Sequence, residues 1–169
     1  KKNPYIIFVI KKFFHQFASP KSYFRIANKI ARPFLAVFFL AYLASLIWGI
    51  FFTPPDAIQG NSYRIIYMHV PASFVAQMLF IAMAVTSSVF LIWKLKLAAY
   101  VSKSIAPIGA LITFFALFSG SVWGIPTWGT WWQWDARITS TLILFIMYLG
   151  LISLHASFEN KEKADKFFS

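Results

Sequence analysis

Two features of the sequence could carry chemistry: an isolated histidine and a cluster of tryptophans. His69 stands between Met68 and Val70 at the start of a long apolar stretch. A histidine at membrane depth is uncommon and points to a functional site. Imidazole is also a common ligand of metals, including haem iron. The alternative is an interfacial histidine hydrogen-bonded to a neighbouring helix, and the residues alone leave both interpretations open.

Five of the seven tryptophans lie between residues 123 and 137. Tryptophan is enriched at the interfaces of any membrane protein, but usually over several helix ends. Here a single segment holds them, and Gly124, Pro126 and Gly129 shape its backbone. This concentration favours a platform for a flat aromatic ligand over an ordinary interfacial belt. The five residues are Trp123, Trp128, Trp131, Trp132 and Trp134.

Charged side chains accompany both features. Arg64 precedes the histidine, and Asp135 and Arg137 follow the tryptophans. Guanidinium groups pair well with carboxylates such as haem propionates, but on the residues alone simple anchoring or an Asp135–Arg137 ion pair explains them slightly better. Asp135 fits the N-cap of a following helix better than a catalytic acid. No nucleotide-binding loop and no nucleophile–base–acid set is present, so an enzyme with its own active site fits poorly.

Composition places these residues in a membrane. Hydrophobic residues make up 59% of the 169 residues and charged residues 12%, against about a quarter charged in a soluble domain. The net charge of +11 could indicate nucleic acid. However, the basic residues cluster at the ends of apolar runs, as anchors to a lipid bilayer do, so we expect no nucleic-acid partner. The absence of cysteine excludes disulfides and thiolate metal sites within this chain.

The apolar runs predict an all-α fold, a polytopic transmembrane bundle of four spanning helices. We expect one transmembrane domain over residues 34–158, preceded by a basic amphipathic cytoplasmic or interfacial segment, 1–33, and followed by a cytoplasmic tail or linker, 159–169. The expected helices cover about 34–51, 71–93, 105–122 and 136–155, with the tryptophan-rich segment as a loop over 123–135.

The distribution of basic residues predicts the orientation. All but two of the sixteen lie in the N-terminal segment, the link after the second helix or the C-terminal tail. The positive-inside rule therefore places both termini in the cytoplasm and puts the tryptophan loop and His69 on the outer face. His155 falls at the far end of the fourth helix, about 25 Å from that face, and His15 lies in the basic segment. Neither can share a ligand with His69.

Three stretches carry a resemblance to a known family. WGIPTWGTWWQWDARITS, residues 123–140, resembles the WWD signature of the haem-handling membrane proteins of cytochrome c biogenesis. GNSYRIIYMHVPAS, residues 60–73, and APIGALITFFALFSGSVWG, residues 106–124, are similar to the CcmC (haem exporter protein C) family within that group. The resemblance implies a non-enzymatic protein that binds haem b at the periplasmic face of the bacterial inner membrane. It also implies delivery to the haem chaperone CcmE, with CcmD and the CcmA–CcmB ABC transporter as partners.

The resemblance also implies roles for individual residues. His69 matches the first of two axial ligands of haem iron, and Arg64 and Arg137 match positions that hold the propionates. The five tryptophans and Asp135 fall within the motif. The family has six spanning helices and a second axial histidine after the fourth, so we expect this chain to be C-terminally truncated and to lack that ligand. The alternatives are a larger haem lyase that joins haem to a cytochrome, and the membrane subunit of a transporter.

Overall fold

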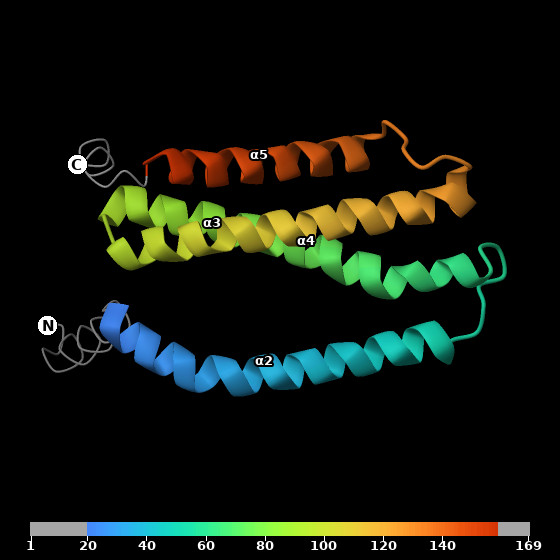
Figure 1. Cartoon of the computed structure of the whole chain (residues 1–169), viewed down its shortest axis with the longest axis horizontal. Coiled ribbons are helices and arrows are strands. Elements are labelled where there is room, and N and C mark those ends of the chain that lie inside the picture. The colour runs from blue at the N-terminus through green and yellow to red at the C-terminus, as the bar shows by residue number, and fades with distance from the viewer. Residues whose placement is uncertain (1–19, 159–169) are drawn as a thin grey trace, which may run out of the picture.

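Long helices dominate the computed structural model, which describes residues 20–158 (Figure 1). The elements are α2 (Pro20–Phe51), the 3-10 helix η1 (Asn61–Ile65), α3 (Ile66–Trp93), α4 (Lys96–Trp128) and α5 (Ala136–Phe158). Four helical segments are long and apolar enough to cross a membrane, the second of them formed by η1 and α3 together. The predicted all-α membrane fold is confirmed. Residues 1–19 of the expected basic segment and the expected tail 159–169 lie outside the described residues.

The helices extend further than the sequence predicts. α2 begins at Pro20 rather than near residue 34, because Pro20 fits the first helical turn and Pro33 removes only its own N–H from the backbone ladder. Likewise, α3 is entered directly from η1, so Pro71 lies inside the helix rather than in its first turn. α4 continues through Pro126 and ends at Gly129, whose φ of 74° suits a helix C-cap.

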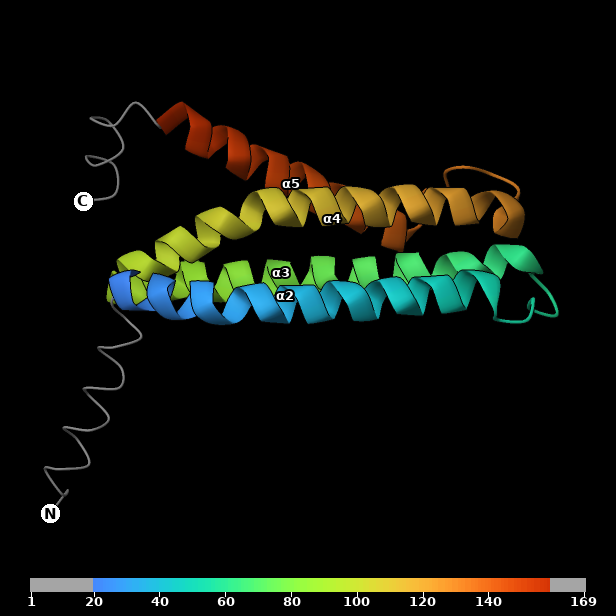
Figure 2. The same ribbon diagram turned by 60° about the horizontal axis from the view of Figure 1, so that its bottom comes forward.

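The bundle has two chemically different ends. The N-terminal end of α2, the α3–α4 turn and the C-terminal end of α5 lie together, and the α2–η1 and α4–α5 connections lie at the opposite end (Figures 1 and 2). We name the first the basic end, after Lys21, Arg25, Lys29, Arg32, Lys94, Lys96 and Lys103. The second, the tryptophan end, holds Arg64, Arg137 and both acidic residues of the described chain, Asp56 and Asp135.

Small residues on α4 let its neighbours pack closely. Ala106, Ala110 and Ala116 are nearly inaccessible, at 2%, 6% and 2% exposure. Tyr148 of α5 is fully buried against Gly109, where any side chain would collide with its ring. Close approach over small residues is the usual way that helices associate in lipid, where no hydrophobic force drives them together. α4 therefore forms the centre of the bundle, with α3 and α5 on its flanks.

α2 is fastened at the tryptophan end. A Cβ added to Gly49 would lie 2.5 Å from the Tyr67 ring of α3, so this ring packs directly on the α2 backbone. In addition, an Arg64 Nη2 donates a hydrogen bond of 2.8 Å to the carbonyl of Thr53 just after α2. These two contacts hold the α2–η1 connection against the start of α3.

Candidate functional site

The imidazole of His69 is held by the α4 backbone. Its Nδ1 lies 3.1 Å from the carbonyl oxygen of Ala116 and 3.1 Å from Ser119 Oγ. Since a carbonyl can only accept, Nδ1 carries the proton of the neutral ring and donates it. Nε2 then keeps its lone pair and can accept a long hydrogen bond of 3.5 Å from Ser73 Oγ. A ring fixed through Nδ1 with an unprotonated Nε2 is the arrangement found in histidines that bind metals.

Gly120 gives the imidazole its space. A Cβ built on Gly120 would lie 2.8 Å from His69 Cε1 and 3.4 Å from Nδ1, so the ring sits directly over the glycine. On another side, Trp123 approaches edge-on, with ring centroids 5.8 Å apart and planes at 72°. The Trp123 indole N–H in turn donates a 2.8 Å hydrogen bond to Gln59 Oε1. The loop after α2 therefore positions the indole that packs against the histidine.

His69 lies on the wall of a cavity of about 450 Å³. This volume falls within the roughly 300–1,000 Å³ typical of small-molecule sites. We name it the outer cavity, and its lining is Gln59, His69, Ser73, Gln77, Ala116, Leu117, Gly120, Trp123, Thr127, Trp128, Arg137, Ile138 and Thr141. The structure therefore brings together four predicted site residues, His69, Trp123, Trp128 and Arg137.

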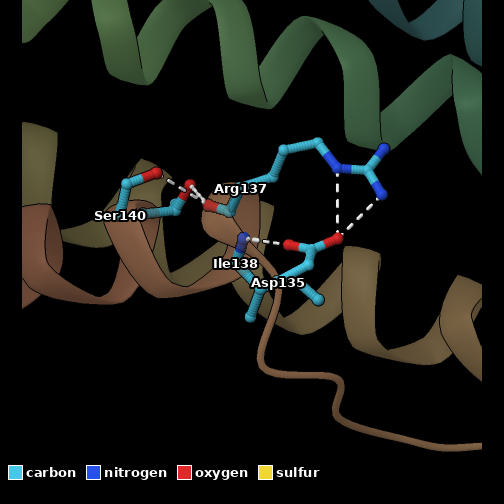
Figure 3. Close-up of polar contacts among 5 residues, drawn as sticks. Asp135, Arg137, Ile138 and Ser140 are labelled. Carbon is cyan, nitrogen blue, oxygen red and sulfur yellow. Dashed lines mark hydrogen bonds and ion pairs between the residues drawn. The ribbon is translucent and has the colours of Figure 1, made fainter.

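Asp135 orients Arg137 and starts α5. Asp135 Oδ1 accepts a 2.9 Å hydrogen bond from the Ile138 N–H, which is the expected N-cap contact, and Oδ2 accepts hydrogen bonds of 2.8 and 3.2 Å from the Arg137 guanidinium (Figure 3). The Ile138 N–H and then Arg137 hold the pKa of Asp135 below its usual value. The guanidinium also lies 5.4 Å from the centre of the Trp128 ring, within cation–π range. Both the capping role and the local ion pair are confirmed.

Removing this cap is expected to lower thermal stability in a pH-dependent way. Because the folded-state pKa is depressed, the contribution is complete above the ordinary aspartate range, about pH 4, and fades as pH falls through the lowered value. We expect Asp135→Ala in detergent to melt a few degrees below the unsubstituted protein at pH 7, with a smaller gap at pH 3. Asp135→Asn, which keeps a capping oxygen, is the control. An equal loss in both variants would contradict the capping role.

The remaining predicted residues lie outside the cavity lining. Arg64 donates to Thr53, and its buried Nε has no partner among the described residues. In the α4–α5 loop, Trp131 packs edge-on against Phe118 at 5.8 Å, and Trp132 packs edge-on against Trp134 at 5.5 Å.

The predicted tryptophan loop, residues 123–135, is therefore divided. Its first part, 123–128, is the end of α4, and only 129–135 connects the helices. A loop was expected because glycine and proline interrupt this stretch. The helix persists because a single proline costs one backbone hydrogen bond, and the buried Gly124 packs beneath the Trp128 ring. As a result, Trp123 and Trp128 face the cavity, and the other three indoles do not share its wall.

The sequence analysis did not predict several of the residues that line the outer cavity. Ser73 and Gln77 follow His69 at steps of four along α3 and so share its face, a spacing that could have identified them. Gln59 and Thr141 come from separate elements, and no local pattern connects either with His69. Among residues 20–158 no group of three histidine, cysteine or acidic side chains could hold a metal ion. One imidazole is therefore the metal ligand that the described residues offer at this cavity.

Fold and site together define a class: a polytopic membrane protein with an aromatic cavity built around a single imidazole near one end of its helices. The chain belongs to the CcmC family, since the family model described as "Heme exporter protein C" matches residues 13–169. Curated relatives that the chain matches carry that same name, among them those of Escherichia coli, Haemophilus influenzae and Rhodobacter capsulatus. The Escherichia coli protein is 44% identical over 156 residues, covering 92% of this chain and 63% of the relative. The Haemophilus influenzae protein is 41% identical over 150 residues (89% and 61%). The Rhodobacter capsulatus protein is 40% identical over 149 residues (88% and 62%). This chain thus spans about three-fifths of the length of the relatives it matches.

Proposed function

We propose that this protein binds haem b at the tryptophan end and passes it to the haem chaperone CcmE during cytochrome c maturation. One observation carries the proposal: the Ala116 carbonyl fixes the His69 proton on Nδ1, which leaves Nε2 unprotonated, with only a long 3.5 Å contact to Ser73 Oγ, beside a cavity that two indoles and a guanidinium also line. Haem offers an iron that accepts an imidazole nitrogen, a flat apolar ring and two carboxylates. The name of the relatives, heme exporter protein C, supports the same ligand.

Each lining residue has a role that its chemistry permits. His69 ligates through Nε2, while Ala116 and Ser119 hold the ring in orientation. Trp123 and Trp128 supply apolar contact area. Arg137 pairs with a propionate. No covalent bond of the haem needs to change in these roles, so we propose a binding and delivery function rather than an enzyme.

Residues outside the cavity lining complete the proposed platform. Trp131 and Trp134 are 47% and 74% exposed, and with Trp132 they extend an aromatic surface along the loop beside the cavity. We propose that this surface covers the exposed edge of the haem. We also propose Arg64, the other arginine of the tryptophan end, as the second propionate cation. Asp135 acts through Arg137 and is a positioning residue.

Charge distribution supports the proposed location. The described residues of the basic end carry positive charges and include no acid. The tryptophan end holds two arginines and two acidic residues, so its charges balance. By the positive-inside rule we place the basic end in the cytoplasm and the tryptophan end in the periplasm, across the bacterial inner membrane. CcmD and the CcmA–CcmB transporter are the proposed partners there. No second histidine of residues 20–158 lines the cavity, so the second axial ligand has to come from elsewhere.

Affinity purification of the full-length protein tests this proposal against its rivals. We expect non-covalent haem and CcmE to co-purify with it, the haem having the absorption spectrum of a histidine-ligated iron. A haem lyase would instead yield a cytochrome with haem covalently attached. A transporter subunit of another kind would yield neither haem nor CcmE, and that result would overturn the proposed function.

A further inference from the structure

The turn between α2 and η1 is built by the side chain of Asp56. Its Oδ1 accepts hydrogen bonds of 2.9 Å from the Ile58 N–H and 2.8 Å from the Gln59 N–H. The backbones of Asp56 and Gly60 also exchange hydrogen bonds of 3.1 and 3.0 Å. Gly60 has a φ of 58°, which a residue without a Cβ adopts at no steric cost. Together these contacts fix the backbone from which the Gln59 side chain extends.

Gln59 reaches from this turn to the end of α4. Its Oε1 accepts the 2.8 Å hydrogen bond from the Trp123 indole N–H, across 64 residues of chain. Because the indole N–H can only donate, the oxygen of the amide rather than its NH₂ group has to face Trp123. The N–H is also the only polar group of the indole. With that group engaged by Gln59, Trp123 has no unpaired donor to offer to a ligand in the outer cavity.

The orientation of the Trp123 indole bears on the imidazole. The two rings pack edge-on, with centroids 5.8 Å apart and planes at 72°, and both line the outer cavity. A tryptophan side chain turns about two torsions, each with more than one favourable setting. The hydrogen bond to Gln59 restrains the ring away from its attachment to the backbone, so it selects one of these orientations. The face that Trp123 presents to the cavity therefore depends on a residue of the α2–η1 turn.

We propose that Gln59 is a positioning residue of the haem site, which holds the Trp123 indole against His69, and that Asp56 supports it by building the turn. This inference rests on the proposed function and adds the residues that orient the aromatic wall. Gln59 acts on the haem through the indole. Asp56 is not part of the cavity lining, so it acts through Gln59.

The hydrogen bond itself can be tested in the haem-free protein. In Gln59→Leu the side chain offers no acceptor. The full-length protein is labelled with ¹⁵N at tryptophan, and the indole N–H resonance of Trp123 is identified by its absence from Trp123→Phe. We expect this resonance to shift in Gln59→Leu and its proton to exchange faster with deuterium, because a hydrogen bond protects against exchange. An unchanged resonance would overturn the positioning role.

Haem titration tests what the hydrogen bond does for binding. We expect Gln59→Leu to bind haem about three- to tenfold more weakly, below the roughly 10–100-fold loss that follows removal of a direct partner of a metal ligand. Asp56→Ala should weaken binding in the same direction. Gln133→Leu is the matched control and should bind as the unsubstituted protein does, because Gln133 lies in the α4–α5 connection at the same end, outside the cavity lining.

A double-mutant cycle separates positioning from direct contact with the haem. If Gln59 acts through the indole N–H, adding Gln59→Leu to Trp123→Phe should cause no further loss of affinity. An equal further loss in that background would overturn the positioning role, since Gln59 would then contact the haem itself. Equal affinities in Gln59→Leu and Gln133→Leu would also overturn it and leave the proposed function standing. No haem binding by the unsubstituted protein would overturn both.

Discussion

Replacing His69 with alanine is expected to remove most of the haem that the full-length protein carries. Loss of partners that merely orient a metal ligand commonly reduces metal affinity about 10–100-fold, and loss of the ligand itself should cost at least as much. The spectrum of any remaining haem should lose the features of imidazole ligation. Purified protein scored for haem by absorption is the measurement.

Two controls separate ligation from a structural effect. His155→Ala removes a histidine near the basic end of α5, and we expect it to keep both the haem and the spectrum. Free imidazole added to His69→Ala can enter the space left beside Gly120 and should restore haem binding in part. Haem unchanged in amount and spectrum after the His69 substitution would remove His69 as the ligand.

Adding one methyl group at Gly120 is expected to lower haem content about tenfold, as loss of a ligand-orienting contact does. The new Cβ would lie 2.8 Å from His69 Cε1, so the ring has to move. That movement breaks the 3.1 Å contact between Nδ1 and the Ala116 carbonyl, which fixes the tautomer and the direction of Nε2. Folding should be preserved, because alanine favours a helix by about 1 kcal/mol relative to glycine and the displaced group is the end of a side chain.

Gly150→Ala provides the matched control for this substitution. A Cβ at Gly150 meets no heavy atom within 4 Å, and the residue lies in α5 away from the cavity lining. We therefore expect unchanged haem content with equal or slightly higher thermal stability. If Gly120→Ala binds haem as Gly150→Ala does, the close packing of the imidazole on α4 has no part in binding.

Much of the fold was predictable because membrane solvation acts on short stretches of sequence. A long apolar run must form a helix in lipid, since every backbone group has to be paired within the segment. The helix ends were less predictable. The expected ranges began just after Pro33, began at Pro71, and left Pro126 in a loop, yet each of these prolines lies inside a helix. A proline removes one hydrogen bond, and whether neighbouring turns and helices compensate for that loss is decided by packing.

The candidate site was predictable in part. The types and positions of His69, Trp123, Trp128 and Arg137 were sufficient to select them as candidates, although the residues alone left their roles open. Their grouping in one cavity, and the separation of Trp131, Trp132 and Trp134 from its lining, depended on α4 continuing to Trp128. At 100° per residue along a helix, the length of α4 decides which way each indole points. An assignment of residues 123–135 to a loop could not supply those directions.

By itself, the sequence determined that this protein is a bundle of membrane helices with its indoles and one imidazole near the same boundary, because hydropathy and charge act locally. Only the tertiary structure decided which nitrogen of that imidazole is hydrogen-bonded. Nδ1 is bound because Gly120 lets α3 approach the Ala116 carbonyl, across 47 residues of chain. Contacts between residues distant in sequence depend on how helices cross, and no local pattern encodes that geometry.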